Sequence, residues 1–119
     1  MIASDAMAQE DETWTSDDGH FTVSFKSELQ PLTINKIHRW TLHVADIDGK
    51  AISNAQLVIE GGMPEHNHGL PTSPAVTASL GDGDYQVEGM RFHMRGYWEI
   101  RVSIDTGTTR DSVTIDLTL

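Results

Sequence analysis

Cysteine is absent from the 119-residue chain, and this absence removes several kinds of chemistry at once. No disulfide can hold the fold together, and no thiolate can act as a nucleophile or bind zinc or an iron–sulfur cluster. Any site for a soft metal must therefore be built from histidine and methionine. Export is still compatible with this composition, because the missing cysteines say only that the fold is not held by disulfides.

Basic residues are scarce as well. The chain has 8 Lys and Arg against 18 Asp and Glu, which gives a formal charge of −10 at pH 7. Clustered Lys and Arg are what bind the phosphates of nucleic acids and the headgroups of anionic lipids. Both partners are therefore disfavoured. An acidic surface instead raises the local concentration of cations and can steer a basic partner.

Long apolar runs are also missing, so we expect no membrane insertion of this chain, since a spanning helix needs about 18 or more apolar residues. The first eight residues end in Ala6-x-Ala8, a step of the kind that precedes a signal-peptidase cut, but without the apolar core of a signal. Two interpretations stay open. The segment is the remnant of an export signal, which predicts a periplasmic or extracellular protein, or it is an artificial or frayed terminus.

Helical periodicity is the last absence, because no stretch has apolar residues at i, i+3, i+4 and i+7. Residues 1–19 are polar and acidic, which predicts a disordered segment or linker. From residue 20 to residue 119, apolar and polar residues alternate as they do in half-buried strands, so these residues are predicted to form one domain. The predicted strands cover residues 21–25, 40–44, 55–60, 75–80, 85–87, 97–104 and 113–119.

Seven short strands with frequent turns over about 100 residues are typical of an all-β, immunoglobulin-like β-sandwich of antiparallel strands. Residues 63–74 hold three of the four prolines and are predicted to be a long loop. Tyr85, at the start of a strand, resembles a tyrosine corner, in which the hydroxyl bonds back across a turn. Trp40 is a candidate core tryptophan.

Enzyme motifs are missing from the sequence. It contains no Gly-x-Ser-x-Gly elbow, no phosphate-binding glycine loop with lysine and no His-Glu-x-x-His. The acidic run at residues 81–84 lacks the alternating ligands and the closing glutamate of a calcium loop, so we predict a hairpin turn there. We therefore do not expect an enzyme.

Histidine and methionine gather in a first short segment, where Met63, His66 and His68 lie within six residues. Without thiolates, this combination suits Cu(I), or copper that cycles between oxidation states, better than zinc, calcium or magnesium. If the segment is extended, the two imidazoles project to the same side. Glu65 between them is either a further oxygen ligand or a solvated side chain.

A second segment holds Met90, His93 and Met94. Strand alternation would place Met90 and Met94 on one face and His93 on the other, so we expect Met94 to complete the site and His93 to be exposed or to support a ligand. The predicted metal ligands are therefore Met63, His66, His68 and Met94. No cofactor other than copper, as Cu(I) or Cu(II), is implied.

Each assignment has an alternative. Met90 and Met94 could simply fill the core beside Phe92, and the two loop histidines could be exposed polar residues. The remaining histidines are scattered over other predicted strands, and a structural or surface role is expected for all of them. They are His20, His38 and His43.

Several short motifs between residues 20 and 119 give the chain a resemblance to the YtkA-like domains. The matching features are Asp48-Gly49-Lys50, Ala55, Met63-Pro64-x-His66-x-His68-Gly69, Gly83-x-Tyr85 and Phe92-x-Met94-x-Gly96-x-Trp98. The family comprises exported immunoglobulin-like sandwiches that are often associated with copper handling and similar in shape to CopC-like carriers. Where many members carry methionine, this chain has His66, which shifts the ligand set toward a harder metal.

The resemblance implies an extracytoplasmic copper carrier or chaperone that passes the ion to an envelope protein partner by ligand exchange. The competing hypothesis is an accessory or docking module of an envelope or transport complex. Under it, the Met-Pro and Phe-x-Met-x-Gly-x-Trp residues serve the fold, and the histidines are incidental.

Overall fold

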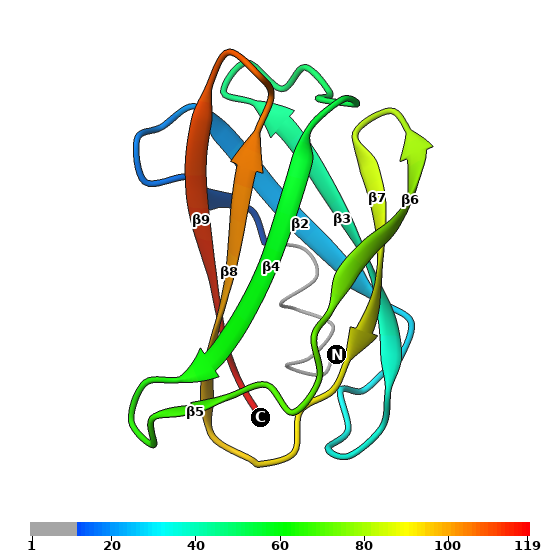
Figure 1. The fold of residues 1–119 in the computed structure, drawn as a ribbon, viewed down its shortest axis with the longest axis vertical. Helices are drawn as coiled ribbons and strands as arrows, with labels where there is room; N and C mark the ends of the chain where they lie inside the picture. Colours follow the sequence, from blue (N-terminus) through cyan, green and yellow to red (C-terminus); the bar gives the residue numbers. More distant parts are fainter. Residues whose placement is uncertain (1–11) are drawn as a thin grey trace, which may run out of the picture.

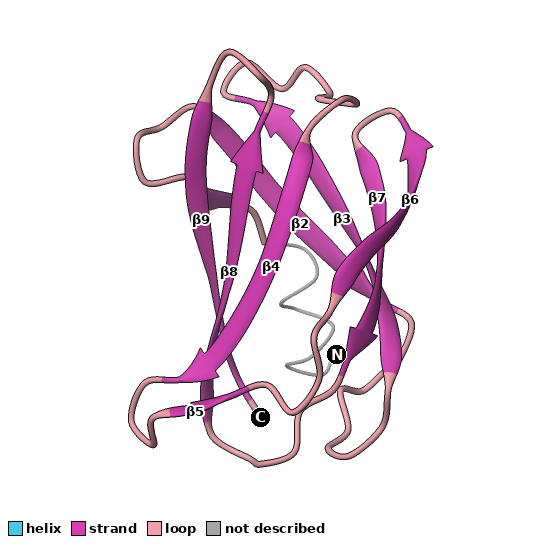
Figure 2. Cartoon of the chain, in the orientation of Figure 1, coloured by secondary structure: helices cyan, strands magenta, loops and turns pink. Residues whose placement is uncertain are grey.

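The computed structural model describes residues 12–119, and every regular element within them is a β-strand (Figure 2). No helix in this part of the chain is long and apolar enough to cross a membrane. The strands are β1 (Trp14–Thr15), β2 (Phe21–Ser27), β3 (His38–Asp46), β4 (Gln56–Met63), β5 (His68–Gly69), β6 (Ala75–Gly81), β7 (Asp84–Met90), β8 (Tyr97–Asp105) and β9 (Arg110–Thr118).

The strands form two antiparallel sheets that face each other as a β-sandwich (Figure 1). One sheet has the order β1-β2-β3-β7-β6 and the other the order β5-β4-β8-β9. When the two-residue strands β1 and β5 are set aside, the seven long strands have the order of a constant-type immunoglobulin domain, with four strands against three. The all-β sandwich and all seven predicted strands are confirmed.

Strict alternation builds the core between the two sheets. On β2, Phe21, Val23 and Phe25 point inward and are at most 3% exposed, while the residues between them are partly solvated. The same pattern holds for the apolar face of β8. Trp40 is a core residue, as predicted, and its ring stacks on Phe25 with centroids 4.0 Å apart.

Tyr85 forms a tyrosine corner, but at a different place from the tyrosine corner of immunoglobulin domains. Its hydroxyl donates to the carbonyl of Ile52 at 2.6 Å and accepts from the amide of Ala55 at 3.1 Å. In antibody domains, the corner tyrosine begins the sixth strand and bonds a few residues upstream. Here it lies on β7, the fifth long strand, and fastens the distant connection between β3 and β4.

The domain begins earlier than residue 20. β1 pairs with β2, Trp14 stacks on Phe25 with centroids 5.9 Å apart, and Ser16 is buried. A two-residue strand carries too little alternation to be seen in the sequence. The predicted Ala6-x-Ala8 step and the rest of residues 1–11 lie outside the described residues.

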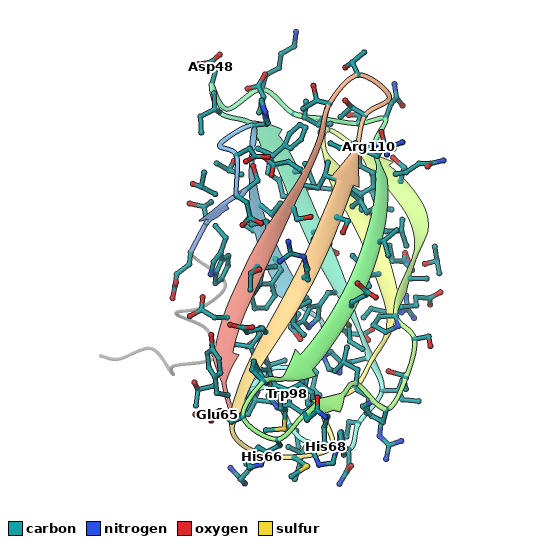
Figure 3. All side chains as sticks on the ribbon, turned by 60° about the vertical axis from the view of Figure 1, so that its left-hand side comes forward. Asp48, Glu65, His66, His68, Trp98 and Arg110 are labelled. Carbon is teal, nitrogen blue, oxygen red and sulfur yellow. The ribbon has the colours of Figure 1, made fainter. Side chains whose placement is uncertain are left out.

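The sandwich has two ends of different composition, which Figure 3 shows at its top and bottom. The histidine end comprises the connections at residues 28–37, 64–67 and 91–96, and the carboxylate end comprises residues 16–20, 46–55, 82–83 and 105–111. In Figure 3, the labelled His66, His68, Glu65 and Trp98 lie at the histidine end, and Asp48 and Arg110 lie at the other.

Candidate metal site

The first histidine segment forms a hairpin at the histidine end. β4 ends at Met63 and β5 begins at His68, and these two residues face each other in the strand pair. The chain reverses over residues 64–67, where the amide of His66 donates to the carbonyl of Met63 at 3.1 Å. Asn67 has a φ of 54°, a left-handed conformation that asparagine tolerates in turns.

Two consecutive glycines let this hairpin close. A Cβ atom on Gly62 would lie 2.9 Å from the carbonyl oxygen of His68, and one on Gly61 would lie 2.6 Å from the Ile100 side chain. Both distances are too short for any larger residue without a shift. The predicted long loop over residues 63–74 is thus corrected, since its first part is a tight hairpin that continues β4.

The second segment is a loop that packs directly on the hairpin. β7 ends before residues 91–96, and Gly96 has a φ of 133°. A Cβ atom there would lie 2.8 Å from Cε of Met63, so the methionine methyl group rests on the loop backbone. On the other side, Nε1 of Trp98 donates to the carbonyl of Met94 at 3.0 Å.

His93 lies in this loop beside the hairpin, where strand alternation did not place it. The sequence predicts that it is exposed or supports a ligand, on the face opposite Met94. The exposed alternative is wrong, because the residue is half-buried, with its ring centroid 6.2 Å from that of His68 and 5.6 Å from that of Trp98. The alternation argument fails because the strand that it assumed ends at Met90.

A sequence signal for this loop was present. Gly89 and Gly96 bracket the segment, and both have positive φ values, 91° and 133°. Glycine in such a conformation interrupts the extended backbone on which alternation depends. The two glycines therefore mark a segment in which strand alternation does not predict the directions of the side chains.

Three imidazoles form a row across the hairpin and the loop. The ring centroids of His66 and His68 are 6.4 Å apart, and those of His68 and His93 are 6.2 Å apart. Because metal–nitrogen bonds are about 2.0–2.1 Å long, two imidazoles on one ion have centroids within about 6.5 Å of each other. Within residues 12–119, no three His, Asp or Glu side chains converge closely enough to hold an ion as placed, so at least one ring must move for all three imidazoles to bind.

The ring nitrogens of this row have no hydrogen-bond partners in the part of the chain that the structure describes. His66 and His68 are exposed, and across the described residues no hydrogen bond reaches their rings. Nδ1 of His93 is buried and has no hydrogen-bond partner in that same part of the chain. A buried ring nitrogen without a partner is uncommon in folded proteins. The row therefore has free coordinating capacity.

The methionines differ in their exposure. Met63 and Met90 are at most 1% exposed and belong to the core. Met94 is half-buried and packs at the edge of the core, next to His93. The thioether of Met94 is thus the more accessible of the two predicted sulfur ligands. Met63 lies immediately beneath the hairpin turn that carries His66.

Two carboxylates and the guanidinium of Arg101 line a shallow pocket beside the hairpin. Its lining includes Met63 and His68 together with Glu60 and Glu99. Glu99 accepts a hydrogen bond from the hydroxyl of Tyr97 at 2.8 Å, and this bond raises the pKa of Tyr97. Desolvation and the charges of Glu99, Asp116 and Glu65 act in the same direction.

The other histidines have structural or surface positions. His38 is buried, its Nδ1 lies 2.9 Å from the carbonyl of Lys36, and its Nε2 accepts a hydrogen bond from Trp40 at 3.1 Å. Burial lowers the pKa of His38, against the opposing effects of the Lys36 bond and the charge of Glu28. His43 is exposed and paired with Asp84 at 2.7 Å, and His20 is exposed at the carboxylate end.

Comparison with known proteins gives one match. The family model described as YtkA-like matches residues 13–103, a span that includes the hairpin and the loop with His93 and Met94. No curated protein and no solved structure matches the chain significantly.

Proposed function

The chain belongs to the YtkA-like family, and from that premise we propose that it is an extracytoplasmic copper-binding protein, a carrier that holds its ion at the histidine end. The observation that carries the proposal is the pairing of His66 with His68, whose exposed ring centroids lie 6.4 Å apart and whose ring nitrogens have no hydrogen-bond partner among residues 12–119. Exposed imidazoles at this separation can share one ion.

The predicted ligands lie in the two segments that meet there. The hairpin supplies His66, His68 and Met63, and the loop supplies Met94. Direct packing of the Met63 methyl group on Gly96 holds the two segments together. Imidazole and thioether together suit copper, because imidazole accepts either oxidation state and thioether favours Cu(I).

A carrier needs an accessible ion and no catalytic group. The exposed histidines would let a partner protein of the envelope approach and take the copper by ligand exchange. The rigid sandwich beneath them needs no rearrangement for this step. The formal charge of −10 attracts cations to the chain as a whole.

The test is a competitive titration of the metal-free protein with Cu(I) and with Cu(II) against chelators of known affinity. We expect one ion to bind tightly, and the double variant His66→Ala/His68→Ala to weaken binding by at least about 100-fold, since losing a ligand costs more than losing a supporting partner. The matched control is His20→Ala/His43→Ala, which removes two exposed imidazoles elsewhere.

Two results would contradict the copper carrier. The first is binding to the native protein no tighter than binding to scattered surface histidines. The second is an equal loss in the control and in the hairpin variant. Either result would favour the docking module, in which the histidine end serves the fold or contacts a partner without metal.

A further inference from the structure

We propose that His93 is a third imidazole ligand of the copper site, so that the site takes Cu(II) as well as Cu(I). This inference rests on the proposed function, because it extends the same site. It begins from the position of the His93 ring, whose centroid lies 6.2 Å from that of His68, while the centroid of His66 lies 6.4 Å from that of His68. His68 is thus the ring that neighbours both of the others, which come from separate segments.

The unsatisfied nitrogen of His93 is the second observation. Its Nδ1 is buried and lacks a hydrogen-bond partner in the part of the chain that the structure describes. Burying a polar atom without a partner costs free energy, so such an atom calls for an explanation. A metal ion bound to Nδ1 of His93, between the hairpin and the loop, would supply the missing partner. By contrast, the buried imidazole of His38 has both nitrogens within hydrogen-bond distance of a partner.

The surroundings hold the His93 ring in position. It meets the ring of Trp98 edge-on, with an interplanar angle of 68°. Trp98 is fully buried and hydrogen-bonded to the loop through the carbonyl of Met94. The core therefore fixes the ring that the loop contributes to the site, which is the His93 ring beside His68.

His66 is the ring that completes the set by moving. The three imidazoles do not converge as they lie, but His66 is exposed on a turn, and exposed side chains change rotamer within nanoseconds. Rotation of this side chain would be needed to bring a third nitrogen to an ion bound by His68 and His93, because the three groups do not converge as they lie. Three imidazoles form a borderline-hard set, which suits Cu(II) better than two thioethers do.

The experiment counts the nitrogen ligands directly. The native protein is loaded with one equivalent of Cu(II), and pulsed electron paramagnetic resonance counts the coordinated imidazoles. We expect three in the native protein and two in His93→Phe, whose ring keeps the contact with Trp98 while losing both nitrogens. We also expect competitive titration to show that the Cu(II) affinity of this variant is about 10–100-fold lower than that of the native protein. Cu(I) affinity should fall less, because the thioethers remain.

The control is His20→Phe, which makes the same substitution at an exposed histidine of the opposite end and should leave both readings unchanged. Two coordinated imidazoles in the native protein would overturn the assignment without any variant. An unchanged count and affinity in His93→Phe would also overturn it, while loss of binding in His66→Ala/His68→Ala would leave the copper carrier standing. A native protein without tight copper binding overturns the carrier and this inference together.

Discussion

The two ends of the sandwich use their polar side chains in opposite ways. At the carboxylate end, acidic groups bond to nearby backbone amides. Asp46 accepts from the amides of Asp48 and Lys50, and Asp105 accepts from that of Gly107. At the histidine end, the imidazoles of His66, His68 and His93 have no such partners within residues 12–119. Polar groups with hydrogen-bond partners inside the protein stabilise turns, whereas polar groups without such partners can bind a ligand.

Asp111 is the clearest example of a polar group with hydrogen-bond partners inside the protein. The residue is 8% exposed, and its carboxylate accepts hydrogen bonds from Ser16 Oγ at 2.6 Å and from the amides of Asp18, His20 and Ser112. Burial alone would raise the pKa of Asp111, but these bonds lower it to about 2. The carboxylate ties the segment before β2 to the start of β9.

The largest effect on stability is expected from removing this group. Asp111→Ala leaves the buried Ser16 hydroxyl and three partly buried amides without their acceptor, so we predict a loss of about 2–4 kcal/mol in the free energy of unfolding. Urea unfolding measures it. Asp48→Ala, an exposed carboxylate at the same end, is the control and should change stability by less than about 0.5 kcal/mol.

Copper affinity should not follow that stability loss. Asp111→Ala is expected to bind copper as the native protein does at a temperature where both are folded, because residue 111 lies at the opposite end from the imidazole row. Equal weakening of copper binding by Asp111→Ala and by His66→Ala/His68→Ala would contradict the assignment of copper binding to the histidine end alone.

Acid should weaken the two ends in separate pH windows, with a smaller effect than that of Asp111→Ala. The lowered pKa of Asp111 means that its contribution is present above pH 3.8, the ordinary value, and is lost as pH falls toward about 2. His38 also has a lowered pKa, because burial favours its neutral form. Its contribution is present above pH 6.5 and is lost as pH falls below that value, since the unfolded chain then binds the proton more readily.

Unfolding by urea between pH 7.5 and 5 isolates the second window. We expect native stability to fall over this range and the fall to be absent from His38→Gln, which has no imidazole at this position. His43→Gln is the matched control, because its imidazole is exposed, and it should keep the native fall. An identical pH dependence in native protein and His38→Gln would show that His38 does not account for it.

Most of the fold could be predicted because the signal was local. Alternation on β2 and β8 reports directly which residues face the core, and turn residues mark where strands end. β1 and β5 were missed because two residues carry no alternation. The corner made by Tyr85 was expected, but its partners in the connection between β3 and β4 depend on a contact across about 30 residues of sequence.

The candidate site was harder to predict for a related reason. The proximity of His66 and His68 follows from their separation by one residue, which sequence shows. The place of His93 depends on where β7 ends and how Gly96 turns the loop, so it required the three-dimensional structure. The burial of Met63 was hidden because Gly61 and Gly62 look like a strand terminator, although they continue β4.

The central claim is that copper binds at the histidine end. The most direct test is a nuclear magnetic resonance spectrum of the backbone amides, recorded as Cu(II) is added in steps up to one equivalent. Paramagnetic broadening should first remove the signals of residues 61–70 and 91–98, while those of residues 46–55 and 105–111 persist. Broadening that begins at the carboxylate end, or that spreads evenly over the surface, would contradict a copper site built on the hairpin and the loop.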